Sequence, residues 1–179
     1  MLAAAEAMGA LAGVVVFTGD PARGGSEEVF RASLEINYLA PLLLARQAAE
    51  RMRAAGTAGS VVLFSSMQGG YPFENSSAYG AAKAALVHGA RVLAKESGGK
   101  ANIRVNVVAP GATMAGMAQA SLRSGKYDCF VEEGTIPRFG RAEDVARVVR
   151  FLLEPDNYVT GQVITVDGGL TLRRDLRTG

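Results

Sequence analysis

Short apolar runs alternate along the chain with longer stretches that have helical propensity or periodicity. The apolar runs are nearly continuous, as in strands buried on both faces, and they cover 14–17, 60–65, 102–111 and 163–166. The helical stretches cover 2–11, 26–55, 77–97 and 141–153. Strands that alternate with helices of this length predict an α/β fold with a doubly wound parallel sheet of about four strands.

Helix ends and irregular segments carry local signals. Ser26, followed by two glutamates, is typical of a helix N-terminus, and Pro41 predicts a kink or break near residues 39 and 40. Residues 112–138 show no clear period, and so long an irregular segment in a compact domain is a candidate lid over a ligand site. Residues 173–179 are expected to form a frayed tail.

The composition limits the classes of function. The chain has 179 residues, 49% of them hydrophobic and 20% charged, which suits one domain spanning 1–179. Its net charge of +2 is too small to indicate a nucleic-acid surface. The single cysteine, Cys129, excludes an internal disulfide, and no Cys/His cluster has metal-ligand spacing. We therefore expect a metal-free cytoplasmic protein with a small-molecule site.

The apolar N-terminal residues 1–17 could be mistaken for a signal peptide or a membrane span. They lack a basic start, contain Glu6, and fall short of the roughly 20 residues that a helix needs to cross a bilayer. A helix followed by a strand is the better interpretation, and no membrane partner is expected.

A tyrosine, a lysine, a serine and an asparagine supply candidate chemistry. Tyr79 and Lys83 stand four positions apart in a predicted helix, so both side chains leave one face of that helix. Ser66 follows the second predicted strand, and Asn37 lies in the helix before that strand. A phenol beside an ammonium, with a hydroxyl nearby, can move a proton on and off a carbonyl oxygen, as in carbonyl reduction or alcohol oxidation. The alternatives are an ordinary helix-surface pair and, for Asn37, a kink residue.

Five motifs resemble those of the short-chain dehydrogenase/reductase family. They are EINYLA around Asn37, LFSSMQG around Ser66, SAYGAAKAAL around Tyr79 and Lys83, RVNVVAPG at 104–111, and YVTGQVITVDGG near the end. Within the family the sequence is most similar to the 3-oxoacyl-acyl-carrier-protein reductase type. The resemblance implies a Rossmann-like sheet and a nicotinamide cofactor, NADP or NAD.

The resemblance also implies roles for the residues at matching positions. Tyr79 would be the general acid that protonates the carbonyl oxygen, and Ser66, which the family spacing selects over Ser65, would hydrogen-bond that oxygen. Lys83 would hold the ribose hydroxyls of the cofactor and lower the pKa of Tyr79. Asn37 would anchor a water molecule that links Lys83 to solvent.

Further positions are expected beside the cofactor and the substrate. Pro110 and Gly111 resemble the turn that packs beside the nicotinamide, with Thr113 in backbone contact with its carboxamide; a plain strand-ending turn is the alternative. The residues expected to line the substrate pocket are Met67, Gln68 and Met114, although methionines at such spacing also fill cores.

The glycine-rich TGxxxGxG loop of the family has no match in the sequence. TGDPARGG at 18–25 imitates it, but Arg23 replaces the middle glycine, and only 60 positions separate Gly19 from Tyr79. The better alignment puts VVVFTGD at 14–20 on the family's central strand, where Gly19 alone survives from an Asn-Asn-Ala-Gly turn. We therefore expect an N-terminally truncated Rossmann-like fold that keeps the catalytic residues and lacks the adenosine half of the cofactor site.

The leading hypothesis is an oxidoreductase that reduces a ketone, such as a 3-oxoacyl thioester, with NADP or NAD through the asparagine, serine, tyrosine and lysine named above. The alternative is a non-catalytic, truncated subunit that supports an active short-chain reductase partner. The intact polar residues favour the enzyme, and the altered FTGD turn favours the subunit. The resemblance further implies a homo-oligomer, or a hetero-oligomer with a related reductase, formed through the helices after Ser26 and Ser77 and the C-terminal strand.

Overall fold

A computed structural model describes residues 1–125 and 127–172 of the chain. Its four strands form one parallel sheet in the order β1-β2-β3-β4. The strands are β1 (Gly13–Val16), β2 (Gly59–Phe64), β3 (Ile103–Pro110) and β4 (Val163–Val166). Because every strand runs in the same direction, their carboxyl ends meet at one edge of the sheet. The predicted α/β fold with a parallel sheet is confirmed.

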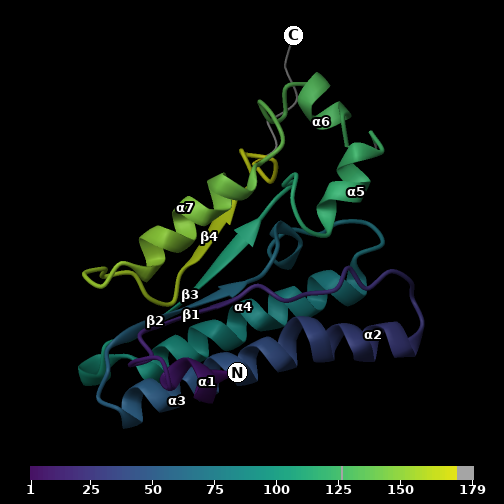
Figure 1. Cartoon of the computed structure of the whole chain (residues 1–179). Helices are drawn as coiled ribbons and strands as arrows, with labels where there is room; N and C mark the ends of the chain where they lie inside the picture. Colours follow the sequence, from purple (N-terminus) through teal and green to yellow (C-terminus); the bar gives the residue numbers. More distant parts are fainter. Residues whose placement is uncertain (126, 173–179) are drawn as a thin grey trace.

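Helices cover both faces of this sheet (Figure 1). One face packs on α3 (Ala40–Ala54) and α4 (Ser77–Ser97), with α2 (Glu27–Leu34) beside α4, and the other face packs on α7 (Ala142–Leu153). The remaining helices are α1 (Leu2–Glu6), α5 (Ala118–Arg123) and α6 (Cys129–Glu132), and 3-10 turns cover Met67–Gly69 and Gly99–Ala101. Successive side chains of a strand point to opposite faces of the sheet, so both faces carry apolar residues. Val61 and Leu63 pack toward α3 and α4, whereas Val62 packs toward α7.

The predicted break in the helix after Ser26 is present. Ser26 caps α2, since its hydroxyl oxygen accepts a hydrogen bond from the backbone N–H of Val29 at 3.4 Å. Between α2 and α3 the backbone forms a π-helical segment, Glu35–Leu39, immediately before Pro41. Proline has no N–H to continue the regular α-helical ladder, and the wider turn absorbs that interruption. Asn37 lies in this wide turn, fully buried.

Three segments differ from the prediction or fall outside it. The first helix ends at Glu6 rather than residue 11, because Leu2 is its only buried residue and residues 7–10, which would continue it, are exposed. The segment 112–138, predicted to be irregular, contains the short helices α5 and α6, and its role as a lid remains a prediction. The predicted tail 173–179 lies outside the described residues. Within the described part of the chain, no helix combines the length and apolar character needed to cross a membrane.

Candidate active site

The end of β2 and the start of α4 are held together by small side chains. Ser65 donates a hydrogen bond from its hydroxyl to the backbone carbonyl of Lys83 at 3.0 Å. A Cβ at Gly69 would come within 2.9 Å of the Lys83 carbonyl carbon, and one at Gly80 within 2.9 Å of the Gln68 carbonyl oxygen. The loop after β2 can therefore lie directly on α4 only because these positions lack side chains.

The side chains of Ser66 and Tyr79 interact where the loop after β2 lies on α4. Ser66 follows β2 and caps the 3-10 turn, where its hydroxyl oxygen accepts the backbone N–H of Gln68 at 3.2 Å. Burial raises the pKa of Tyr79, and a hydrogen-bonding interaction with the Ser66 side chain lowers it by less, so the pKa stays above the ordinary value of 10. Tyr79 is therefore a protonated phenol at neutral pH.

Lys83 lies one turn further along α4, and its ammonium is buried. The residue is 2% exposed, and its Nζ donates to the Phe64 carbonyl at 2.9 Å and to the Thr18 carbonyl at 3.5 Å. The ammonium also lies 5.8 Å from the centroid of the Tyr79 ring. Burial lowers the pKa of Lys83 from 10.5 to about 8, so this lysine still carries its charge at pH 7. Backbone carbonyl groups at the end of β2 and just after β1 thus bind the ammonium of Lys83, which lies close to the ring of Tyr79.

The direction of the Tyr79 pKa corrects one implication of the resemblance. A lowered pKa was expected from the charge of Lys83, yet the pKa of Tyr79 is raised. Removal of the phenol from water penalises the phenolate, and the opposing contribution comes from Ser66.

Asn37 joins the π-helical segment to the loop after β1. Its Oδ1 accepts the backbone N–H of Asp20 at 3.0 Å, and its Nδ2 donates to the Asp20 carbonyl at 2.9 Å and to the Ser33 hydroxyl oxygen at 3.2 Å. Ser33 in turn donates to the carbonyl of Ala78 at 3.0 Å, next to Tyr79. Sequence reasoning did not identify Ser33 or Asp20; the only available signal was the position of Ser33, four residues before Asn37.

Gly19 lies where the loop after β1 passes between Asn37 and Lys83. A Cβ at this position would stand 3.1 Å from Asn37 Oδ1 and 3.3 Å from Lys83 Nζ. Lys83 has three N–H donors, and two of them are directed to the carbonyl groups of the strand ends. The third donor and the missing side chain at Gly19 are compatible with the hydroxyl groups of a ribose, and the contact of Lys83 with such a ribose remains a prediction. The role of Asn37 in holding a water molecule remains a prediction.

The turn predicted to pack beside the nicotinamide lies at the same edge of the sheet. Pro110 ends β3, and the N–H of Gly111 donates to the Val166 carbonyl at 3.0 Å. A Cβ at Gly111 would stand 2.5 Å from the Cβ of Asp167, so only glycine fits without movement. Thr113 is buried, and its hydroxyl donates to the Gly111 carbonyl at 3.3 Å. The turn is rigidly placed, and its contact with a cofactor remains a prediction.

The three positions expected at the substrate differ in their surroundings. Met67 lines a cavity of about 200 Å³ together with Ser66. Gln68 accepts a hydrogen bond from the Ser76 hydroxyl, which ties the loop to the start of α4. Met114 is half-buried, and its backbone N–H donates to the Gly140 carbonyl at 2.8 Å. Of the three, Met67 alone is among the residues that line this cavity.

The described residues include no group of three or more histidine, cysteine, aspartate or glutamate side chains that could hold a metal ion. Cys129 is exposed in α6. The arrangement at the sheet edge instead offers a buried cation, a protonated phenol and a serine hydroxyl. Such a set can bind a polar oxygen and transfer a proton to it.

Known proteins share this sequence pattern. A family model described as enoyl-(acyl carrier protein) reductase matches residues 4–171. The 7alpha-hydroxysteroid dehydrogenase of Bacteroides fragilis is 33% identical over 146 residues, covering 81% of this chain and 56% of that protein. The 3-oxoacyl-[acyl-carrier-protein] reductase of Mus musculus is 41% identical over 141 residues, covering 79% and 56%. The chain spans about half the length of the curated relatives it matches.

Solved structures share the fold. A short-chain type dehydrogenase/reductase from Mycobacterium ulcerans superposes with a TM-score of 0.86 at 33% identity, covering 96% of this chain and 64% of that one. The structure of ElxO with NADP bound gives a TM-score of 0.84 at 26% identity, covering 96% and 72%. On the matched residues, the shared sheet and these relatives, the chain belongs to the short-chain dehydrogenase/reductase family.

Proposed function

We propose that this chain carries the catalytic part of an NAD(P)-dependent reductase that converts a ketone to an alcohol, and that the reaction is reversible. The observation that supports this most strongly is the interaction of the Tyr79 phenol with the Ser66 side chain above the buried ammonium of Lys83. Ser66 lies in the loop after β2, and Tyr79 and Lys83 lie on α4. Gly69 and Gly80 allow this loop and this helix to be in direct contact.

Each side chain has a distinct part in this proposal. Tyr79, protonated at neutral pH, donates its proton to the carbonyl oxygen of the ketone, and Ser66 donates a hydrogen bond to the same oxygen. The charge of Lys83, 5.8 Å from the ring centroid, stabilises the phenolate that remains. When bound, NADPH or NADH supplies the hydride. Pro110, Gly111 and Thr113 form the rigid turn against which we place the nicotinamide.

Asn37 acts through the positions of other groups. It fixes Asp20 and therefore the loop that contains Thr18, whose carbonyl accepts from Lys83. Its contact with Ser33 also links the π-helical segment to the first turn of α4. This network holds the ammonium at a constant place while the proton moves.

The relatives, rather than the geometry, support the choice of a substrate class. Two of them are 3-oxoacyl-[acyl-carrier-protein] reductases, from Mus musculus and Thermotoga maritima, at 41% and 40% identity. We therefore place a 3-oxoacyl thioester first among candidate ketones. We propose the cytoplasm as the compartment, because a single cysteine allows no internal disulfide. Either NADP or NAD fits the residues described above.

A second candidate function is a non-catalytic subunit that supports an active short-chain reductase. Exposed apolar side chains favour it: Phe17 after the edge strand β1 is 73% exposed, and Leu34 and Leu43 on α2 and α3 are 45% and 47% exposed. Such a surface suits a partner, either a second copy of this chain or a related reductase. The same surface is compatible with a catalytic oligomer.

Calorimetric titration of the purified chain with NADPH and with NADH separates the two functions. The reductase predicts micromolar binding of at least one nucleotide, weakened about tenfold or more in Lys83→Met because a charged donor is lost. Lys95→Met, which changes an exposed lysine of the same helix, serves as the matched control and is expected to bind like the wild type. No detectable binding of either nucleotide would favour the supporting subunit.

A further inference from the structure

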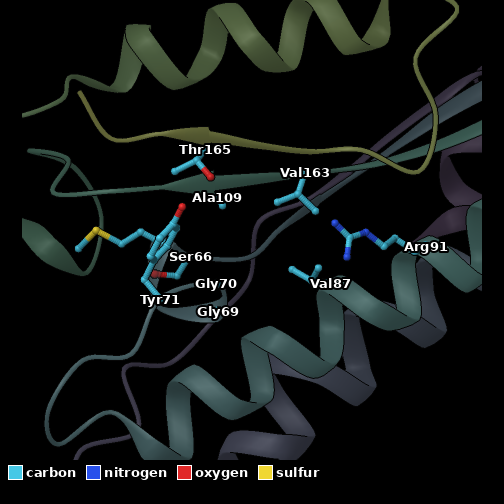
Figure 2. A pocket seen from close by; sticks show the side chains of 10 residues that line it. Ser66, Gly69, Gly70, Tyr71, Val87, Arg91, Ala109, Val163 and Thr165 are labelled. Carbon is cyan, nitrogen blue, oxygen red and sulfur yellow. The ribbon is translucent and has the colours of Figure 1, made fainter. Parts of the chain in front are cut away.

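A cavity of about 200 Å³ opens beside Ser66, between α4 and the strands β3 and β4 (Figure 2). Ten residues line it: Ser66, Met67, Gly69, Gly70, Tyr71, Val87, Arg91, Ala109, Val163 and Thr165. They come from the loop after β2, from the middle of α4 and from the two strands on that side of the sheet. The cavity is therefore continuous with the candidate active site through Ser66, and it extends away from Tyr79 along α4.

The two ends of the cavity differ in chemistry. Ser66 and Tyr71 lie at one end, where the Tyr71 ring rises toward Thr165, and Arg91 reaches in from α4 at the other end (Figure 2). Val87 and Val163 stand between the ends and make the middle of the cavity apolar. A ligand that fits this order has a polar reactive group, an apolar body and a distal group that suits a guanidinium.

The guanidinium of Arg91 is available to a ligand. Within the described residues it has no hydrogen-bond or ion-pair partner, unlike Arg31, Arg46 and Arg138, which pair with carboxylates. The ten lining residues contain no acidic side chain, so nothing in the lining neutralises the charge. A guanidinium binds planar carboxylates through two parallel hydrogen bonds, which neither a ketone nor an alcohol can match.

The size of the cavity indicates part of a ligand rather than a whole one. Pockets that enclose a complete drug-sized molecule measure about 300–1,000 Å³, and a water molecule takes about 30 Å³ of the liquid. A cavity of about 200 Å³ therefore has room for a short chain of several carbons with a carboxylate, and Ser66, one of the candidate catalytic residues, is part of its lining.

We propose that this cavity is a substrate subsite that binds an apolar arm ending in a carboxylate, with Arg91 as the residue that determines this specificity. The proposal rests on the reductase function above and adds a preference, among ketones, for those that carry an anionic group several carbons from the carbonyl. Val87 and Val163 contact the arm, and Ser66 contacts the oxygen of the reacting group.

Binding is tested first, without any turnover. The valine methyl resonances of the chain are followed by NMR during titration with hexanoate and, separately, with 1-hexanol. We expect hexanoate to shift the methyl signals of Val87 and Val163 and to bind about tenfold or more tightly than hexanol, because hydrogen bonds to charged groups are the strong ones. Equal binding of the two compounds, or shifts confined to other valines, would overturn the proposal.

Variants then assign the preference to Arg91. Arg91→Ala is expected to abolish the preference for hexanoate, and Arg91→Lys to retain part of it as a single charge. Arg150→Ala removes an exposed arginine from α7, on the opposite face of the sheet, and is the matched control. If Arg150→Ala weakened hexanoate binding as much as Arg91→Ala, the effect would come from overall charge and the subsite would be refuted.

Kinetics distinguish a substrate arm from a separate carboxylate effector. With NADPH, Arg91→Ala should raise KM about tenfold or more for 6-oxoheptanoate and leave KM for the neutral analogue 2-heptanone unchanged. Hexanoate should compete with 6-oxoheptanoate. If Arg91→Ala left the KM for 6-oxoheptanoate unchanged, or if hexanoate inhibited non-competitively, the role of Arg91 in substrate binding would be refuted. The proposed reductase function would not be affected by either result. If neither ketone reacted although hexanoate still bound, the reductase itself would fail and the substrate role with it.

Discussion

Replacing Lys83 by methionine tests how the fold holds a charged group in its interior. Lys83 is 2% exposed, and burial lowers its pKa from 10.5 to about 8. The folded chain therefore holds this proton less tightly than the unfolded chain. The buried charge reduces the free energy of unfolding below about pH 8, and this loss is relieved as the pH rises from about 8 toward 10.5. Methionine has a similar length and no charge, so it removes this pH dependence.

The size of the effect follows from the two pKa values. One pKa unit corresponds to about 1.4 kcal/mol, so raising the pH from 7 to 9.5 should stabilise the wild type relative to Lys83→Met by about 2 kcal/mol. The hydrogen bonds that Lys83 donates to the carbonyl groups of Thr18 and Phe64 are lost in the variant at both pH values. Their loss shifts both measurements and largely cancels from the comparison.

The assay is urea unfolding of both proteins at pH 7 and pH 9.5, followed by circular dichroism. Lys95→Met, an exposed lysine of the same helix, is the control and should show no comparable change between the two pH values. A difference between wild type and Lys83→Met that stays constant within about 0.5 kcal/mol would refute the claim that burial lowers the pKa of Lys83 to about 8.

Three further substitutions test the site and its supports. Ser66→Ala removes the contribution that lowers the pKa of Tyr79, so the pH profile of alcohol oxidation should move to higher pH; an unmoved profile would exclude that contact. Ser33→Ala breaks a buried hydrogen bond to α4 and should lower the free energy of unfolding by about 1–2 kcal/mol in urea titrations, whereas no change would show that the bond is dispensable. Gly111→Ala places a Cβ 2.5 Å from that of Asp167 and should cost about 1–3 kcal/mol, measured against Gly25→Ala, which meets open space; equal stability of the two would contradict the close contact.

The sequence pattern predicted the elements well because it acts over short distances. A continuous apolar run identifies a strand buried on both faces, and the strands of the structure fall inside or within a residue of the predicted runs. Pro41 predicted the interruption near residue 39, since a missing N–H acts locally. The exception was the first helix, which ends at Glu6 because residues 7–10 have good intrinsic propensity but stay exposed and gain nothing from packing.

The contacts inside the candidate site depend on packing between distant elements, and sequence could not supply them. Asp20 and Asn37 bond across 17 positions, and Lys83 reaches the Thr18 carbonyl across 65. Neither pair follows from a helical or strand period. The pairing of Asn37 with Asp20 also shows that its amide supports the loop after β1, whereas the family resemblance implied only a water site for it.

The direction of the Tyr79 pKa shift is the second property of the site that the sequence could not supply. The spacing of Tyr79 and Lys83 placed a cation near a phenol, from which a lowered tyrosine pKa was expected. Burial decides the direction instead, and burial is a property of the whole packed site. The same holds for Arg91, which gives no signal in the sequence until α4 and β4 enclose a cavity beside it.

The measurement that tests the central claim most directly is the rate of NADPH oxidation by this chain with an acetoacetyl thioester, compared between wild type and Tyr79→Phe. If Tyr79 is the proton donor, the wild type turns over the thioester and the variant is slower by about 100-fold or more, with an unchanged circular dichroism spectrum. Equal rates in the two proteins, or no turnover by a wild type that binds NADPH, would contradict the proposed active site.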